Sequence, residues 1–280
     1  MAAEDEGDEA EIARLSALLA QPDEAIDLAR AALSLATLAD PALDPRPSLH
    51  ALDALAEGLR DRLGAGVRAD AAALGHYLGH ARGFTGNLEH YYDPSNSYLN
   101  VVLERGAGLP ITLSVIYMEV GRRVGLTVHG IGFPAHFIVG VPERSGMHYL
   151  DPFRGGQRLD RDDLVAQLRQ TYGRGASLDA RMLQPTAKPA IIVRMLNNLK
   201  TVYAKQGQWR PCWRVQHRLL ALQPAAYNER RDWAVISLKA GRAGPAMEML
   251  ERCLATCPPD EREFLQKQRL EAQGKLAQWN

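Results

Sequence analysis

The stretch Gly108–Tyr117, which reads GLPITLSVIY, predicts the start of a buried helix. The glycines at 106 and 108 end the preceding helix, and Pro110 suits a first helical position, where its missing N–H needs no partner. Leu113 and Ile116 then continue an apolar face at helical spacing. The free backbone N–H groups and the dipole of such a helix start favour a thiolate or an oxyanion, so we expect a functional site here.

A small antiparallel sheet is predicted to follow this helix, from three short β-rich segments at residues 127–133, 136–141 and 147–151. If Val141 pairs with Gly146, the connection is the four-residue loop 142–145, and His136 lies directly opposite Asp151. Opposed residues point to the same face of a sheet, and a carboxylate beside an imidazole fixes its tautomer and raises its basicity. The pair is then the orienting half of a catalytic triad.

The nucleophile of such a triad is missing from its expected place, because Pro110 stands at the helix start. The next hydroxyls belong to Thr112 and Ser114, and Ser114 lies one turn, roughly 5–6 Å, deeper along the helix. The candidate catalytic residues are therefore His136, Asp151 and Ser114. The candidate binding residues are Asn96, Pro110, Ile111 and Thr112, since the backbone N–H groups of Ile111 and Thr112 remain available to an anion.

Each candidate also has a purely structural interpretation. Asp151 precedes Pro152 and can cap a local turn instead of orienting His136. Ser114 can donate to the carbonyl four residues before it. Asn96 either faces the cleft or caps the helix that follows it, and His136 can be a structural strand residue.

The C-terminal part of the chain contains a helical repeat. Gly207 and Gly241 are 34 residues apart, as are Pro224 and Pro258, and 34 residues is the tetratricopeptide period. We expect repeats over about 190–224 and 225–258 and a closing helix over 261–279. The predicted organisation is a disordered acidic tail (1–10), an α+β domain with a helical N-terminal segment (11–187) and a repeat domain (188–280).

Bulk properties exclude several classes of protein. The net charge is zero and no basic stripe is visible, so we expect no direct nucleic-acid binding. We find no apolar run long enough for a membrane span and no signal peptide at the acidic N-terminus, which predicts a cytoplasmic protein. Three cysteines are too few for a disulfide scaffold. The i, i+4 pairs Cys253–Cys257 and His76–His80 lack further ligands, so we expect no metal, and no phosphate or dinucleotide motif indicates a cofactor.

Several motifs resemble the core of the transglutaminase-like superfamily: Gly108-Leu109-Pro110, Gly125, Pro134–Val139 and Leu150–Phe153. In that superfamily a Gly-x-Cys opens a helix, a His begins a strand and an Asp precedes a proline. The resemblance implies an α+β, papain-like core and places the three triad positions at Pro110, His136 and Asp151.

A bacterial SirB-type family is the closer resemblance. It is carried by Tyr91–Ser97, Leu109–Ser114, Asp151–Gly156 and the C-terminal repeats, and it covers about residues 50–260. It implies a transglutaminase-like domain joined to tetratricopeptide repeats, in a family loosely linked to the regulation of gene expression.

These observations favour a non-catalytic protein, a pseudoenzyme, whose repeats bind a protein or peptide partner. One alternative is an acyl-transfer or peptidase-type hydrolase in which His136 and Asp151 activate Ser114 or a water. Another is a regulator acting on a transcription or translation factor. The oligomeric state is left open. The position of the Ser114 hydroxyl relative to His136 separates the first two interpretations.

Overall fold

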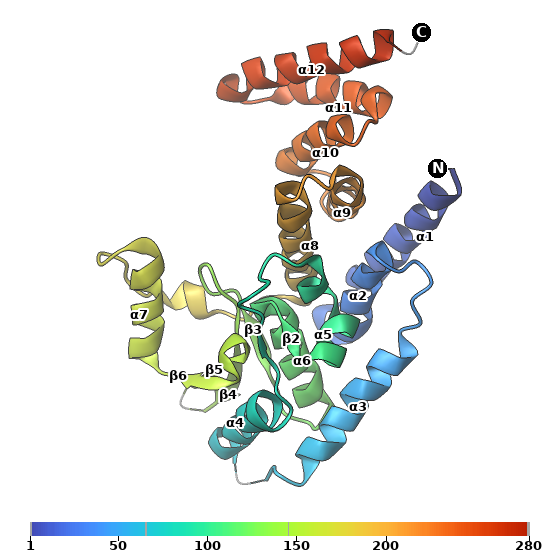
Figure 1. The fold of residues 1–280 in the computed structure, drawn as a ribbon. Helices are drawn as coiled ribbons and strands as arrows, with labels where there is room; N and C mark the ends of the chain where they lie inside the picture. The colour runs from blue at the N-terminus through green and yellow to red at the C-terminus, as the bar shows by residue number, and fades with distance from the viewer. Residues whose placement is uncertain (1, 65, 145, 279–280) are drawn as a thin grey trace. The chain divides into compact units, whose positions relative to one another are not determined.

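The computed structural model describes residues 2–64, 66–144 and 146–278 (Figure 1). Its internal contacts divide the chain into two compact units. We call Leu18–Met195 the core unit, and we call Met1–Ala17 together with Leu196–Asn280 the repeat unit. The helices α1 (Ala2–Leu19) and α8 (Lys188–Lys205) contribute residues to both units.

The core unit is built around α6 (Pro110–Arg123), in which every residue from Pro110 to Gly121 is buried. Helices α2, α3 and α5 pack against it. The helices of this unit are α2 (Leu28–Ser34), α3 (Arg46–Arg60), α4 (Val67–His76), α5 (Leu99–Arg105), α6 and α7 (Arg161–Tyr172). The central position of α6 explains why Thr112, Ser114 and Glu119 are as buried as the apolar residues around them.

A four-stranded antiparallel sheet lies beside α6, in the order β3-β4-β5-β6. Its strands are β3 (His129–Ile131), β4 (Ile138–Glu143), β5 (Gly146–Asp151) and β6 (Gln157–Leu159). The first three were predicted and the short β6 was not. Helices α4 and α6 contact one face of the sheet, and α7 with the segment after it packs on the other. A minor parallel sheet joins β1 (Thr85–Gly86) to β2 (Ala107–Gly108).

The predicted register of the β4–β5 hairpin is wrong by two residues. Glu143 pairs with Gly146, and Val141 pairs with His148. The loop has two residues instead of the predicted four, 142–145, and Ser145 lies outside the described residues. A shift of two positions keeps every side chain on its predicted face, because side chains alternate with period two.

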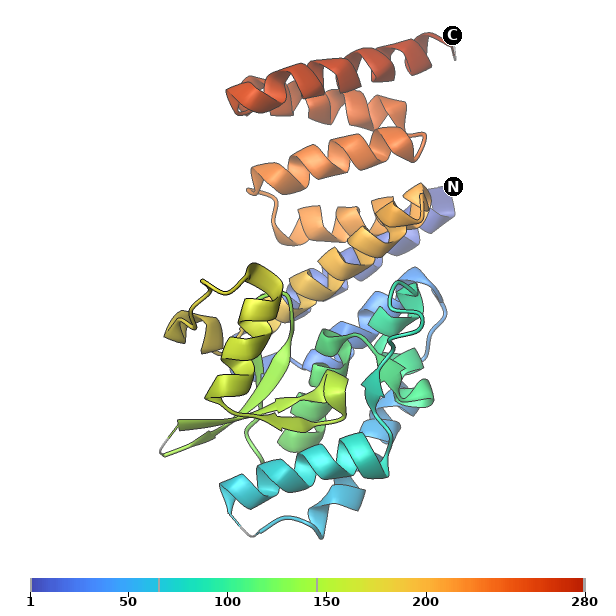
Figure 2. The same cartoon turned by 60° about the vertical axis from the view of Figure 1, so that its left-hand side comes forward.

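The repeat unit continues from α8 through four further helices: α9 (Trp209–Leu222), α10 (Tyr227–Lys239), α11 (Ala243–Thr256) and α12 (Arg262–Ala277). Each packs against the next along the chain, and Figure 2 shows α9 to α12 stacked in succession. Gly207 and Gly241 follow α8 and α10 with φ of 67° and 80°, the left-handed values that end helices. The 34-residue repeat and the α+β fold class are therefore confirmed.

The acidic N-terminus, predicted as a disordered tail over residues 1–10, is helical from Ala2 onward, and Met1 lies outside the described residues. It belongs to α1, and its Asp8 is only 4% exposed. The Asp8 carboxylate accepts hydrogen bonds from Arg214 and Arg218 of α9, at 2.6–3.0 Å. Local composition suggested fraying, but these two guanidinium groups 206 and 210 residues away stabilise the helix.

Candidate functional site

The start of α6 has the geometry that its sequence predicts. Leu109 is the extended residue before the helix, and Pro110 is the first helical residue. The Leu109 N–H donates to the backbone carbonyl of Asn96 at 3.1 Å. Pro110 and Ile111 are both buried. The helix start is thus firmly held, and the side chain at its first position carries no reactive atom.

His136 and Asp151 are brought into direct contact. His136 Nε2 lies 2.9 Å from Asp151 Oδ1, with the Asp151 carboxylate fully buried and the His136 ring 11% exposed. The same carboxylate oxygen accepts the N–H of Phe153 at 3.0 Å, so Asp151 also caps the turn Pro152–Arg154. Both interpretations of Asp151 therefore hold. With Nε2 engaged, His136 Nδ1 has no hydrogen-bond partner among the residues described.

His136 lies in a turn before β4 rather than in the strand itself. Its N–H donates to the carbonyl of Phe133, and the preceding Ala135 has a left-handed φ of 56°. The guanidinium of Arg194 donates to the backbone carbonyl of His136 and stacks over the ring of Phe137, 5.1 Å from its centroid. Burial lowers the pKa of Arg194. Arg194 thus holds the turn that carries the imidazole.

The second carboxylate oxygen of Asp151, unlike the first, is not hydrogen-bonded to any described residue. Asp151 Oδ2 is buried without a hydrogen bond among the residues described, and Arg154 Nε lies 3.7 Å from it. The hydroxyl of Tyr117 on α6 is also buried without a hydrogen-bond partner there. Burial raises the pKa of Tyr117, and the negative charge of Asp151 raises it further. Asp151 therefore influences α6 through its charge as well as His136 through a hydrogen bond.

The hydroxyls considered as replacement nucleophiles are turned into the protein. Ser114 Oγ donates to the carbonyl of Pro110 at 2.8 Å, and Ser114 is fully buried. Thr112 is also fully buried, and its hydroxyl has no hydrogen bond within the described chain. This arrangement gives the Ser114 hypothesis no support.

The side chain of Asn96 is buried, and it bonds to the loop before it instead of capping a helix. Its amide nitrogen donates to the carbonyls of His90 and Tyr91, at 2.7 and 3.2 Å, and its amide oxygen accepts from Asn87 at 3.0 Å. The side chain that caps this segment is Asp93, which accepts from Ser95. Asn96 therefore braces the loop before it and, through its backbone, the start of α6.

Aromatic side chains flank His136, and the sequence analysis missed them as site residues. The Phe153 ring stands edge-on to His136 at 6.0 Å and to Tyr91 at 6.1 Å. Tyr91 is 41% exposed. The motifs that contain Tyr91 and Phe153 were noted for their resemblance, but no local pattern shows that they meet.

The sequence of this chain is similar to a known family and to several known proteins. The model of the transglutaminase-like superfamily matches residues 47–197. A UPF0162 protein of Xylella fastidiosa is 40% identical over 190 residues, which are 67% of this chain and 68% of the relative. This chain belongs to the UPF0162 family.

The chain is also similar to other proteins. A UPF0162 protein of Pseudomonas aeruginosa is 30% identical over 211 residues, covering 73% of this chain and 76% of its own. The F-box only protein 21 of Mus musculus is 26% identical over 132 residues, 44% of this chain and 20% of its own. A tetratricopeptide-repeat model matches residues 199–271. No solved structure gives a significant match.

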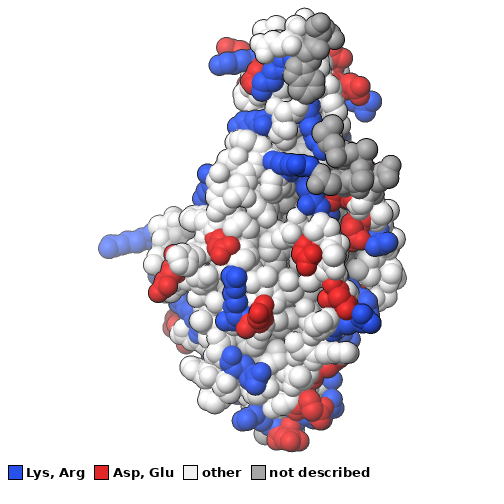
Figure 3. Space-filling view, turned by 45° about the vertical axis from the view of Figure 1, so that its right-hand side comes forward, with Lys and Arg blue, Asp and Glu red and all other residues white. Residues whose placement is uncertain are grey.

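Neither a metal site nor a membrane span is found among the described residues of this UPF0162 protein. No group of three or more His, Cys, Asp or Glu side chains there could hold a metal ion. Within the same residues, no helix is both long and apolar enough to cross a membrane. On the face shown in Figure 3, basic and acidic side chains are interspersed.

The repeat unit of the UPF0162 chain contains a groove of about 630 Å³, lined chiefly by α8, α10 and the start of α12. These are the first helices of successive repeats. The charged and aromatic side chains that line the groove are Lys200, Lys205, Trp209, Arg231, Asp232, Lys239, Asp260, Glu261 and Phe264.

Most charges along the groove are paired with one another. Lys200 and Arg231 both contact Asp232, at 3.0 and 2.8 Å, and Arg231 also pairs with Glu261. Lys239 instead lies over the Trp209 ring, 4.2 Å from its centroid, and makes no ion pair with any described residue. The groove thus combines a cation that lacks an acidic partner with an aromatic surface.

Proposed function

We propose that this UPF0162 protein is a non-catalytic, transglutaminase-like protein whose repeat groove binds an acidic peptide segment of another protein. The observation that carries the proposal is the groove, where Lys239 and Trp209 lie together and Phe264 is 47% exposed. A carboxylate of the peptide would pair with Lys239, and an apolar neighbour would cover the aromatic side chains.

The absence of catalysis is inferred from the start of α6. In the resemblance to the transglutaminase-like superfamily, Pro110 stands where the nucleophile would be, and both nearby hydroxyls are fully buried. Removing the nucleophile of a triad eliminates most of its rate, and the remainder comes from binding and oxyanion stabilisation. The likeness to SirB-type proteins supports a regulatory role, with a transcription or translation factor as the partner class.

Selection of random displayed peptides on the immobilised full-length chain tests the groove. We expect enrichment of peptides with an acidic residue beside an aromatic or aliphatic one. Such peptides should bind Lys239→Glu at least tenfold more weakly than the parent. Arg252→Glu is the matched control, because Arg252 is an exposed cation on α11, a helix that does not line the groove. Equal binding by the parent and Lys239→Glu would refute this site.

A second candidate function, hydrolysis of an amide or ester by an activated water, is favoured by the 2.9 Å contact between His136 and Asp151. In that mechanism Nδ1 of a neutral His136 would accept a proton from the water. The test is the rate of hydrolysis of a panel of peptides and acyl esters. Activity in the parent that is lost in His136→Ala supports the enzyme, and a parent without activity supports the non-catalytic proposal.

A further inference from the structure

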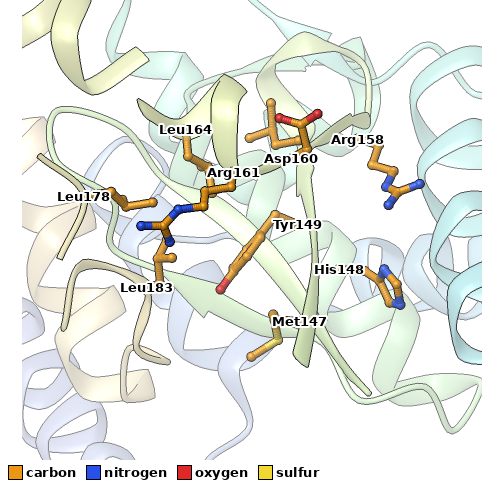
Figure 4. Close-up of a pocket in the computed structure, with 10 residues that line it drawn as sticks. Met147, His148, Tyr149, Arg158, Asp160, Arg161, Leu164, Leu178 and Leu183 are labelled. Carbon is orange, nitrogen blue, oxygen red and sulfur yellow. The ribbon is translucent and has the colours of Figure 1, made fainter. Parts of the chain in front are cut away.

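A cavity of about 300 Å³ lies in the core unit, on the face of the sheet that α7 covers (Figure 4). It is separate from the residues of the His136–Asp151 site. Its lining comes from β5, β6, the first turns of α7 and the segment after α7. The lining residues used below are Met147, Tyr149, Leu159, Arg161, Leu178 and Leu183.

The floor of this cavity depends on Gly140 in β4. Gly140 pairs with Tyr149, and Tyr149 pairs with Leu159, so all three occupy the same face of the sheet. A Cβ at Gly140 would lie 2.8 Å from Met147 Cγ. The missing side chain therefore leaves room for Met147 to lie across β4, beside Tyr149. The result is a hollow in a sheet face that is otherwise filled by the core.

Two polar groups without partners line this hollow, the exposed Arg161 and the half-buried Tyr149. Arg161 makes no ion pair or hydrogen bond with its side chain to any described residue, and neither does the hydroxyl of Tyr149. Figure 4 shows the side chains of Arg161 and Tyr149 converging near Leu183. Burial raises the pKa of Tyr149, so its hydroxyl stays protonated and can donate a hydrogen bond.

The acidic groups near Arg161 are already engaged. Asp160, which also lines the cavity, caps α7: its Oδ1 accepts from the N–H groups of Asp162 and Asp163. Asp179, next to the lining residue Leu178, is bound by the guanidinium of Arg181 at 2.6 and 3.0 Å. The positive charge of Arg161 is therefore left for a ligand.

We propose that this cavity binds a small amphipathic monocarboxylate, with the carboxylate on Arg161 and Tyr149 and the apolar body between Met147, Leu159, Leu178 and Leu183. A planar guanidinium matches a carboxylate with two parallel hydrogen bonds, and the phenol supplies a third donor. The cavity lies at the lower end of the size range of small-molecule sites, which suits a single ring or a short aliphatic chain. This site is independent of the peptide groove proposed above.

Titration of the full-length chain with 4-phenylbutanoate tests the proposal, with 4-phenylbutanamide as the neutral probe. For about twelve non-hydrogen atoms we expect a Kd on the order of 0.1–1 mM for the acid. The amide should bind at least tenfold more weakly. Binding is followed by calorimetry and by the NMR shifts of residues around Tyr149.

Variants locate the site. Arg161→Gln should weaken binding of 4-phenylbutanoate at least tenfold, and Tyr149→Phe should weaken it severalfold. Arg169→Gln is the matched control, because Arg169 is an exposed cation in the last turn of α7 and does not line the cavity. Leu178→Trp, at the half-buried rim, fills the hollow and should also abolish binding without removing a charge. Thermal unfolding of each variant checks that the fold is intact.

Three results would overturn this inference. The first is no saturable binding of the acid by the parent. The second is equal binding of the acid and the amide, which would remove the role of charge. The third is an equal loss in Arg169→Gln and Arg161→Gln, which would indicate a general effect of surface charge.

Discussion

At the residue scale, Asp151 connects three features of the core unit. It accepts from the imidazole of His136, caps the turn that begins at Pro152, and raises the pKa of Tyr117 beyond the effect of burial. A fully buried carboxylate is costly unless it is hydrogen-bonded. The residue therefore has a structural role whether or not any catalysis occurs.

Asp151→Ala is expected to destabilise the core unit by about 2–4 kcal/mol, because it leaves a buried imidazole nitrogen and a backbone N–H without an acceptor. Urea denaturation measures this loss. Asp179→Ala is the matched control, since Asp179 caps a similar 3₁₀ turn by accepting from Arg181 N but is not buried. A loss for Asp151→Ala no larger than for Asp179→Ala would show that the contact with His136 adds nothing.

Because Tyr117 is buried, we expect the stability of the core unit to fall at alkaline pH. Burial first, and the charge of Asp151 second, raise the pKa of Tyr117 in the folded state above the unfolded value of about 10. Its contribution to stability is fully present below pH 10. Above pH 10 the unfolded chain releases the proton more readily, so stability falls as pH rises, by up to about 1.4 kcal/mol per pH unit.

Tyr117→Phe should flatten this decline between pH 10 and 11.5, followed by urea denaturation at each pH. At pH 7 the same variant should be neutral or slightly stabilising, because the deleted hydroxyl has no partner among the described residues. A loss above about 1 kcal/mol at pH 7 would instead indicate that an ordered water satisfies this hydroxyl.

At the element scale, the end of α4 packs on the turn after Asp151 through glycines on both sides. A Cβ at Gly79, in the π-helical turn Tyr77–Ala81, would lie 1.8 Å from the carbonyl oxygen of Gly155. A Cβ at Gly75 would lie 2.7 Å from the carbonyl oxygen of Gly156. The helix can approach this turn so closely only because these positions have no side chain.

Gly79→Ala should therefore destabilise the core unit by at least about 3 kcal/mol, since backbone atoms would have to move apart. Gly274→Ala on α12 has nothing within 4 Å of the added Cβ and should stabilise the chain by about 0.5–1 kcal/mol. Thermal unfolding measures the change in stability of each variant relative to the parent. A Gly79→Ala protein as stable as the parent would contradict the close packing.

At the scale of the whole molecule, the repeat unit is assembled from both ends of the sequence. Residues 1–17 group with residues 196–280, and the link is ionic. Arg218 of α9 is 1% exposed and pairs with Asp8 at 3.0 Å. Burial alone would raise the pKa of Asp8, but the hydrogen bond from Arg214 and the charge of Arg218 together lower it.

Asp8→Ala should destabilise the repeat unit by about 3 kcal/mol, because it leaves a buried guanidinium without its counter-charge. Hydrogen exchange of the α9 amides reports this loss. Arg14→Ala, which removes an exposed pair with Glu11 on the same helix, should cost under about 0.5 kcal/mol. In the parent, the contribution of Asp8 is present above pH 4 and lost as pH falls through its lowered pKa. Equal protection of α9 in both variants would argue against the ionic link.

The sequence alone determined the elements whose signals are local. Pro110 marked the start of α6, and the 34-residue spacing of Gly207 and Gly241 marked the repeats. These signals depend on backbone restrictions and periodicity, which act within a few residues or repeat at fixed intervals.

Only the tertiary structure decided the contacts between distant segments. Arg194 reaches the turn of His136 across 58 residues, and Asp8 reaches Arg218 across 210. Neither end of these contacts carries a local signal, because charged side chains choose partners by proximity after the chain has packed. The hairpin register was misjudged for a related reason: alternation determines which face a residue occupies, whereas loop length determines which residues are paired. The hollow beside Tyr149 likewise exists only once Gly140, α7 and Leu178 are brought together.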